Sequence, residues 1–330
     1  MVRPAVIVLA ALALVPAAAT RTASPAPART AIFYYPWYGT PRHDRRFQHW
    51  NQRGATPPRR IASSFYPARG VYSSGDPAVV RAQMRDIAEA AVDEVVVSWW
   101  GKGSVEDRRL SLVARAARRA GLRVAAHVEP YPDRTPATVR ADAPYLRRFG
   151  ITDLYVYGPE RATAGAWRSQ LRGIAGTRIF AQTTLTGFAA AAGFDGVYTY
   201  DVLVWGGGDF ARICDQARRR HLLCAPSVGP GYDARRATPD RRTKPRHGGL
   251  TYDSMWRAAL RVRADVVTIT SYNEWHEGTQ IEAARPRRGY LSYAGAWGRR
   301  GHAAERAYLV RTAYWTARAR RAATAPTRPQ

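Results

Sequence analysis

The sequence contains very little lysine and only two cysteines, and it has no long apolar run beyond its N-terminus. Of 51 basic residues, only Lys102 and Lys244 are lysines, so the net charge of +26 comes almost entirely from arginine. The arginines are dispersed along amphipathic segments and are not gathered in one basic segment. This pattern indicates solvated helix faces and argues against a specific nucleic-acid partner.

The two cysteines, Cys214 and Cys224, leave little scope for cysteine chemistry. No CxxC motif occurs, and two cysteines alone make a poor metal site. Export of the chain would permit a disulfide between them. Because Cys214 is expected on a helix and Cys224 on the strand that follows, the pattern favours two buried thiols, with a disulfide as the alternative.

The N-terminus has the pattern of an export signal. Arg3 precedes an apolar stretch over residues 5–15, and small residues lead up to a cleavage site near Ala19. The stretch is too short to span a bilayer, and no later segment reaches about 18 apolar residues. We therefore expect a signal peptide over residues 1–19, a disordered linker over 20–29 and a secreted chain without a stable membrane span. A retained N-terminal anchor is the alternative.

Short β-branched or aromatic runs alternate with amphipathic stretches, which is the pattern of a parallel α/β sheet. Helices are expected between the runs, for example over residues 76–91, where Asp76 can cap the first turn and Pro77 suits the first helical position. A last helix is expected over 303–317. The expected strands are residues 31–35, 94–99, 123–129, 153–157, 178–183, 196–200, 222–227 and 266–271.

Eight such units predict a single (β/α)8 TIM barrel over residues 30–322, followed by a disordered tail over 323–330. Two connections are long, residues 39–75 after strand 1 and 228–249 after strand 7. Loops of this length are usually functional or disordered, and both leave the face where barrel enzymes place their sites. No glycine-rich phosphate-binding motif follows a strand, which weakens nucleotide-binding alternatives. We expect a monomer.

The strongest pattern for chemistry is SYNEWHEGTQ at residues 271–280, directly after the eighth expected strand. If this segment turns helically, Glu274 and Glu277 share one face, about 5–6 Å apart at Cβ. Glycoside hydrolysis needs two carboxylates of this kind. A polar barrel rim with solvated glutamates is the alternative. No zinc site is expected, because Gln280 occupies the position of the second histidine of an HExxH motif.

The other strand ends are rich in aromatic residues, among ten tryptophans and eighteen tyrosines in the chain. Aromatic rings stack on the apolar face of a sugar, so these strand ends suit a sugar-binding cleft. For each single aromatic residue, packing inside the barrel is the alternative. His127 and Glu129 stand two apart on one strand and therefore face the same side, which favours a place in the cleft.

The strand ends and following loops contain, in order, FYYPWYGTP with a downstream HW, SSFYP, YSSGDP, VVVSWWGKGS, AHVEPYPDRT, YVYG, PSVGPGYD and ITSYNEWHEGTQIE. Together, over residues 31–282, they resemble glycoside hydrolase family 99, the endo-α-1,2-mannosidase and endo-α-1,2-mannanase family. The resemblance implies a barrel that needs no metal or cofactor and retains anomeric configuration. It implies that Glu274 is a base and Glu277 an acid/base. The sugar contacts that it implies are Tyr35, Trp99, His127, Glu129, Tyr198, Arg236 and Asn273.

Two glutamates on one short turn are awkward for a double displacement, which needs its carboxylates on opposite faces of the scissile bond. The family's proposed mechanism implies another route. The base removes the proton of a mannose 2-hydroxyl, which attacks its own anomeric carbon and gives a 1,2-anhydro sugar. The acid protonates the departing oxygen and then, as a base, activates water.

The resemblance thus implies a secreted, endo-acting hydrolase of α-1,2-mannosidic or glucosyl-mannose linkages in mannan or high-mannose N-glycans. Residues 157–165, YGPERATAG, depart from the family because they are short of the aromatics and Asp of a sugar-contacting loop. The sugars of the outer subsites therefore stay open. One alternative is a barrel glycosyltransferase-like protein of polysaccharide synthesis, which the export signal argues against. Another is a non-catalytic glycan-binding barrel, which the presence of both Glu274 and Glu277 argues against.

Overall fold

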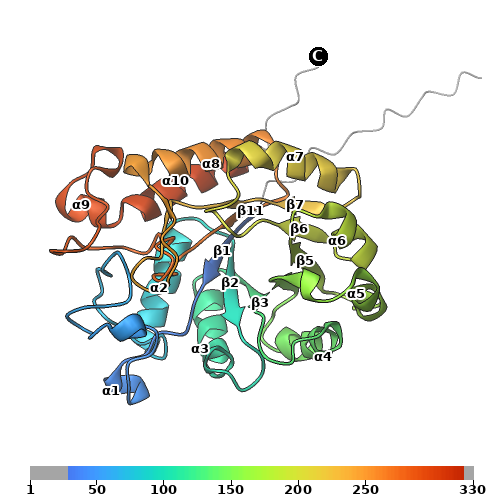
Figure 1. Ribbon diagram of the computed structural model, residues 1–330, viewed down its shortest axis with the longest axis horizontal. Helices are drawn as coiled ribbons and strands as arrows, with labels where there is room; N and C mark the ends of the chain where they lie inside the picture. The colour runs from blue at the N-terminus through green and yellow to red at the C-terminus, as the bar shows by residue number, and fades with distance from the viewer. Residues whose placement is uncertain (1–28, 323–330) are drawn as a thin grey trace, which may run out of the picture.

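The computed structural model describes residues 29–322, and the regions expected as signal peptide and tail, with residues 20–28 of the linker, lie outside them. Parallel strands form one ring around a central axis (Figure 1). Around the ring the order is β7, β6, β5, β4, β3, β2, β1, β11 and β8. The bounds are β1 Arg29–Tyr34, β2 Glu94–Trp99, β3 Arg123–Val128, β4 Asp153–Val156, β5 Arg178–Gln182, β6 Gly196–Tyr198, β7 Leu223–Ala225, β8 Ser227–Val228 and β11 Val266–Ile269.

The seventh expected strand is divided into β7 and β8, with Pro226 between them. β7 pairs with β6, whereas β8 pairs with β11, which in turn pairs with β1. Because the two halves of one strand pair on opposite sides, the ring closes and the predicted (β/α)8 barrel is confirmed. Proline has no N–H to donate to a ladder, which suits Pro226 to the break.

The helices lie outside the ring and cover the sheet (Figure 1). The predicted start of α2 is confirmed, since Pro77 is its first residue and the Asp76 carboxylate accepts the Ala78 N–H at 2.8 Å. The helix bounds are α1 Pro41–Asp44, α2 Pro77–Glu89, α3 Val105–Arg119, α4 Pro136–Arg147, α5 Ala164–Leu171, α6 Thr186–Ala192, α7 Gly207–Arg218, α8 Leu250–Arg261, α9 Gly301–Glu305 and α10 Ala307–Ala322.

The C-terminal helix predicted as one element over 303–317 is two helices, α9 and α10, that meet at Arg306. The Arg306 guanidinium donates to Asp86 at 2.7 Å and to Glu89 at 2.8 Å, both on α2. The single-helix prediction was therefore wrong at this point. Arg306 instead fixes the end of the chain against α2.

Aromatic side chains fill the interior of the barrel. Phe33 of β1 lies 4.7 Å from His127 of β3 and 5.7 Å from Tyr198 of β6, measured between ring centroids. Tyr34, the next residue, points the opposite way and donates its hydroxyl proton to Gln83 of α2 at 2.6 Å. The alternation of side chains along a strand therefore separates an interior layer from a layer under the helices.

Cys214 on α7 and Cys224 on β7 form a disulfide, with their Cα atoms 5.2 Å apart. The prediction of two buried thiols was wrong. The chain reverses direction between the end of the helix and the start of the strand, and this reversal brings the two residues within bonding range.

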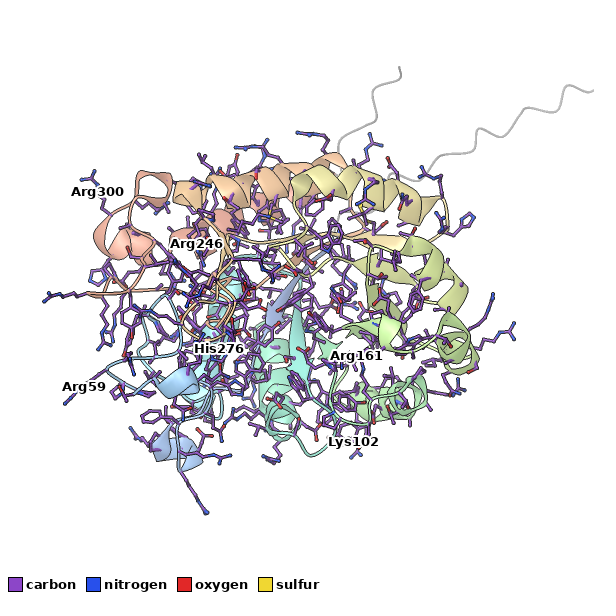
Figure 2. All side chains as sticks on the ribbon, viewed as in Figure 1. Arg59, Lys102, Arg161, Arg246, His276 and Arg300 are labelled. Atoms are coloured by element: carbon purple, nitrogen blue, oxygen red, sulfur yellow. A yellow bond between two sulfur atoms is a disulfide. The ribbon has the colours of Figure 1, made fainter. Side chains whose placement is uncertain are left out.

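The two longest expected connections are present. One joins β1 to α2, and the other, from β8 to α8, contains a short antiparallel hairpin of β9 Tyr232–Asp233 and β10 Thr243–Lys244. Within residues 29–322, no helix is long and apolar enough to cross a membrane. The side chains of Arg59, Lys102 and Arg300 lie spread around the periphery (Figure 2), in keeping with dispersed positive charge.

Candidate active site

The loop after β11 places both predicted catalytic glutamates at the carboxyl end of the barrel. Residues 275–278 form a turn. The turn is held locally, because the Glu274 N–H donates to the Ser271 hydroxyl at 2.8 Å and the His276 N–H donates to the Glu274 carboxylate at 3.0 Å. Glu274 is buried, whereas Glu277 is half-buried.

Both glutamates have raised pKa values, and each for a physical reason. Burial raises the pKa of Glu274 well above its usual range, and the nearby charge of Glu277 raises it further. Burial raises the pKa of Glu277 to about 8, with added repulsion from Asp201 and Glu129. Two carboxylates whose charges repel each other do not both ionise readily, which favours a proton on the pair near neutral pH.

The hydrogen bonds around the pair are unequal. Glu274 accepts backbone N–H groups of His276 and Glu277, and such bonds favour its charged form. Glu277 has the Tyr200 hydroxyl at 3.5 Å as its hydrogen-bond partner. Glu274 thus has two backbone donors that act against its burial, whereas Glu277 has one long contact from a side-chain hydroxyl.

Asn273 and Tyr35 join the catalytic loop to the loop after β1. The Asn273 side chain accepts the Tyr35 N–H at 2.7 Å and donates to the Tyr35 carbonyl at 3.0 Å. Asn273 is fully buried, so these bonds occupy its amide. The Tyr35 hydroxyl forms a short hydrogen bond with the Tyr200 hydroxyl, which leads on to Glu277.

His127, Glu129 and Tyr198 lie together on the neighbouring side of the barrel. His127 Nε2 lies 2.9 Å from the Tyr198 hydroxyl, and its Nδ1 lies 2.9 Å from Oε1 of Glu129. The Ser98 hydroxyl donates to the same Glu129 oxygen at 2.8 Å. Tyr198 and His127 are almost fully buried and lie beneath Tyr200, whose ring stacks on His127 at 5.2 Å.

The side chains of the other two predicted sugar contacts, Trp99 and Arg236, do not join this cluster. Trp99 is fully buried, and its indole N–H donates to Asp107 at 2.8 Å. Arg236 stacks on Tyr290 at 4.4 Å and lines a cavity of about 340 Å³ on the loop after β8. The roles of all seven residues as sugar contacts stay predictions.

Tyr200 is the main site residue that the sequence reasoning did not assign. It follows Tyr198 by two residues, so strand alternation places it on the same face and nearer the barrel mouth. Its backbone has a positive φ of 48°, and the Ser227 hydroxyl accepts its N–H at 2.8 Å. These constraints direct its hydroxyl toward both Tyr35 and Glu277.

Two histidines and a tryptophan form a stack on the other side of Glu274. Trp37 stacks on His49 at 4.5 Å, and His276 lies 5.8 Å from Trp37. Burial lowers the pKa of His49 to about 3 and that of His276 to about 4, so both rings are neutral at neutral pH. His276 Nε2 donates to the His49 carbonyl at 2.7 Å, which anchors the turn to the loop after β1.

The long loop after β8 closes against the same turn. The Asp233 N–H donates to the Glu277 carbonyl at 2.7 Å, and Arg246 donates to the carbonyls of Gly278 and Gln280 at 2.9 and 2.7 Å. Gly278 has a φ of +64°, and a Cβ there would lie 2.9 Å from the Asp233 carbonyl oxygen. Glycine is therefore required where the two loops meet.

A cavity of about 280 Å³ opens beside Gly278, between the two long loops. Phe65 of the first loop and Tyr232 of the hairpin both line it. The prediction that both long connections reach the catalytic face is confirmed. Among residues 29–322, no group of three or more His, Cys, Asp or Glu side chains is placed to hold a metal ion.

The chain belongs to Glycosyl hydrolase family 99, whose profile matches residues 27–158 and 170–321, and it is a glycoside hydrolase. The match is interrupted between residues 158 and 170. This gap overlaps residues 157–165, which depart from the family's sequence pattern.

Individual proteins support the same assignment. The chain is 34% identical to a glycoprotein endo-alpha-1,2-mannosidase-like protein of Danio rerio, over 79% of this chain and 73% of that protein. It is 32% identical to a glycoprotein endo-alpha-1,2-mannosidase of Xenopus laevis, over 78% and 70% of the two chains. Its fold matches the GH99 endo-alpha-mannosidase of Bacteroides thetaiotaomicron with a TM-score of 0.79 and 29% identity, over 89% of this chain and 98% of that one.

Proposed function

We propose that this chain is a secreted, endo-acting hydrolase of α-1,2-mannosidic or glucosyl-mannose linkages in mannan or high-mannose N-glycans. The observation that carries the chemistry is the pair Glu274 and Glu277 on one turn at the carboxyl end of the barrel, with unequal hydrogen bonding and raised pKa values. The substrate class is supported by the names of the related mannosidases.

In this proposal Glu274 is the base. Two backbone N–H groups donate to its carboxylate and favour the charged form that a base needs, in opposition to the burial that raises its pKa. It removes the proton of the 2-hydroxyl of the bound mannose or glucose, and the resulting oxygen attacks the anomeric carbon of its own ring. The product is a 1,2-anhydro sugar, and neither glutamate forms a bond to carbon.

Glu277 is the acid in the first step and the base in the second. With a pKa of about 8 it is protonated near neutral pH and can donate to the departing glycosidic oxygen. Once ionised, it takes a proton from the water that attacks the anomeric carbon, while Glu274 returns its proton to the 2-oxygen as the anhydro ring opens. Two inversions at the anomeric carbon give net retention.

The substrate proposal is tested by digestion followed by mass-spectrometric sizing of the products. The panel is an α-1,2-linked mannan, a high-mannose N-glycan and the same N-glycan carrying a terminal glucose on one arm. An endo-acting enzyme releases disaccharides or longer pieces, and Glu274→Gln and Glu277→Gln variants serve as inactive controls. Release of single mannose residues alone, or no release from any of the three, would reject the proposal.

The proposal of secretion is tested separately. The full chain is expressed with its N-terminus intact, and the protein in the medium is sequenced from its first residue. Cleavage near Ala19 is expected, since that position follows the small-residue site. An intact N-terminus on a cell-bound protein would instead support the retained anchor.

A further inference from the structure

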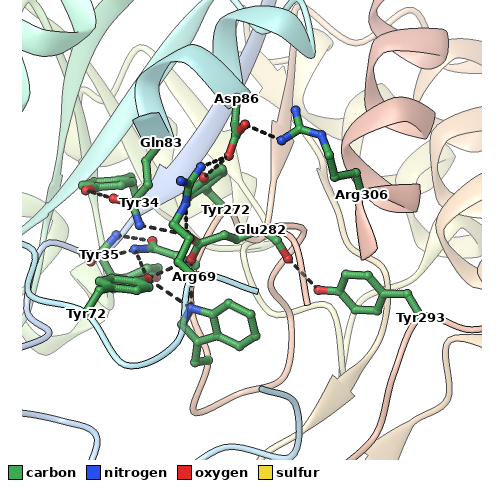
Figure 3. A network of polar contacts seen from close by, with 12 residues as sticks. Tyr34, Tyr35, Arg69, Tyr72, Gln83, Asp86, Tyr272, Glu282, Tyr293 and Arg306 are labelled. Atoms are coloured by element: carbon green, nitrogen blue, oxygen red, sulfur yellow. Dashed lines mark hydrogen bonds and ion pairs between the residues drawn. The ribbon is translucent and has the colours of Figure 1, made fainter. Parts of the chain in front are cut away.

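A buried carboxylate that the reaction does not use lies behind the catalytic turn. Glu282 is fully buried, and each of its two oxygens faces two donor groups (Figure 3). Oε2 accepts the Tyr72 hydroxyl at 2.8 Å and the Trp275 indole N–H at 3.0 Å. Oε1 accepts the Gln83 amide at 2.9 Å and faces Arg69 Nε at 3.4 Å.

Two of these contacts lead to the neighbours of Glu274 in the chain. Trp275 is bound directly by Glu282. Asn273 is bound through Tyr72, whose hydroxyl lies 3.4 Å from the Asn273 amide nitrogen and also accepts the Trp275 indole N–H at 3.1 Å. Glu282 therefore holds both residues that flank Glu274.

We propose that Glu282 is a positioning residue that sets the orientation of Glu274 through Trp275, Tyr72 and Asn273. The inference rests on the proposed role of Glu274 as the base. In this scheme Glu282 contacts neither the sugar nor the carboxylates of Glu274 and Glu277. Its effect is on the geometry of the turn, which must hold the base against a sugar hydroxyl to within a fraction of an ångström.

The donors around Glu282 require a carboxylate and not an amide. The Trp275 indole N–H and the Arg69 guanidinium can only donate, and they face different oxygens of Glu282. A glutamine at position 282 would direct its NH₂ group at one of these two donors, whichever way its amide is turned. The substitution therefore breaks the network although it preserves the volume of the side chain.

The charge on Glu282 is balanced by a small set of neighbouring groups. Burial raises its pKa to about 6, whereas Arg69 and the hydrogen bonds from Gln83 and Tyr72 lower it. Asp86 of α2 faces the same region and raises it, and Asp86 is itself paired with Arg69 and Arg306 (Figure 3). The Tyr34 hydroxyl donates to Gln83, and the Tyr272 hydroxyl donates to Asp86. Protonation of Glu282 below about pH 6 would remove acceptors that the turn needs.

The test is the activity of full-length Glu282→Gln, with Glu94→Gln as a matched control. Glu94 is also fully buried beside arginines and a tyrosine, but it lies at the start of β2, the opposite end of the barrel. For Glu282→Gln, kcat falls on the order of 10- to 100-fold with little change in KM, and the acid limb of the kcat profile changes shape. For Glu94→Gln, thermal stability changes while kcat and its pH profile keep the wild-type form.

A second variant separates positioning from general damage. Trp275→Phe removes the one donor at Oε2 that cannot also accept, so Glu282→Gln combined with Trp275→Phe recovers part of the lost kcat relative to Glu282→Gln alone. If Glu282→Gln does not fold, Tyr72→Phe carries the test, because it removes the link to Asn273 and leaves the charge of Glu282 in place. A lower kcat at unchanged KM is expected there.

Three results would overturn the inference: wild-type kcat and pH profile in Glu282→Gln, an equal effect in Glu94→Gln, or additive losses in the double variant. If the Tyr72→Phe variant carries the test, an unchanged kcat in that variant would also overturn the inference. The Glu274→Gln variant keeps the two proposals apart. If Glu274→Gln is inactive while Glu282→Gln is normal, the positioning role alone is rejected. An active Glu274→Gln enzyme would reject the proposed base itself.

Discussion

The hydroxyl of Tyr200 lies 3.5 Å from Oε2 of Glu277 and also bonds to the hydroxyl of Tyr35. It thereby connects the proposed acid to the loop after β1, through a residue whose backbone has a positive φ. The same hydroxyl lowers the pKa of Glu277 against the effect of burial. The strength of this contact therefore bears directly on the pH range over which Glu277 stays protonated.

Tyr200→Phe should move the alkaline limb of the kcat/KM profile to higher pH, because the bond that favours ionised Glu277 is lost. A hydrogen bond of this kind contributes about 0.5–1.5 kcal/mol, so the shift is expected to stay within about 1 pH unit. Tyr198→Phe is the matched control, since its hydroxyl contacts His127 and not Glu277. A limb that stays in place in Tyr200→Phe, or moves equally in both variants, would contradict this account.

Glu277→Gln should be more stable than the wild type at neutral pH. The folded-state pKa of about 8 lies above the usual value of 4.5, so the wild type is relatively stabilised below pH 4.5 and loses that contribution as the pH rises toward 8. The difference in stability should therefore be small in acid, grow between about pH 4.5 and 8, and then level off. A gain of about 0.5–2 kcal/mol at the plateau is expected.

Thermal denaturation of Glu277→Gln and wild type across this pH range measures the effect. Glu305→Gln serves as a control on an α9 glutamate outside the proposed site. A constant difference between Glu277→Gln and wild type at all pH values would show that Glu277 is not buried at an electrostatic cost.

The disulfide between Cys214 and Cys224 should stabilise the fold without affecting the chemistry. It closes a loop with a sequence separation of 10, for which the chain-entropy estimate is between about 2 and 3 kcal/mol. The Cys214→Ser, Cys224→Ser double variant should melt roughly 4–10 °C lower and keep the wild-type kcat. Thiol alkylation of denatured wild type should label no cysteine before reduction and both after it. Labelling before reduction would contradict the disulfide.

The barrel itself was predictable from the sequence, because strand periodicity and capping are local properties. The eight runs of β-branched and aromatic residues correspond to the observed strands, and Asp76 with Pro77 begins α2 as expected. The errors concern how neighbouring elements pack, at the break between α9 and α10 and at the disulfide. Neither the pairing of the two sides of Pro226 with different strands nor the reversal that joins Cys214 to Cys224 has a local signature.

The catalytic residues of the site were predictable from the sequence, whereas the contacts that orient their side chains were not. Glu274 and Glu277 stood out because two carboxylates directly follow a strand. The environment that distinguishes them depends on contacts such as Tyr35 with Asn273, which are 238 positions apart. Glu282 is the last residue of the family motif ITSYNEWHEGTQIE. Only the packing of Tyr72 and Trp275 around it indicates that it positions the catalytic turn.

The division of labour between Glu274 and Glu277 is tested most directly by kcat/KM on two substrates that differ only in the leaving group. One carries an unactivated mannosyl aglycone, and the other is the α-fluoride of the same glycone, whose fluoride departs without a proton. Glu277→Gln should lose about 10²–10⁴-fold on the first and recover much of that loss on the second. Glu274→Gln should stay slow on both, since the 2-hydroxyl proton must be removed whatever leaves. Recovery of Glu274→Gln on the fluoride, or no recovery of Glu277→Gln, would contradict the assignment.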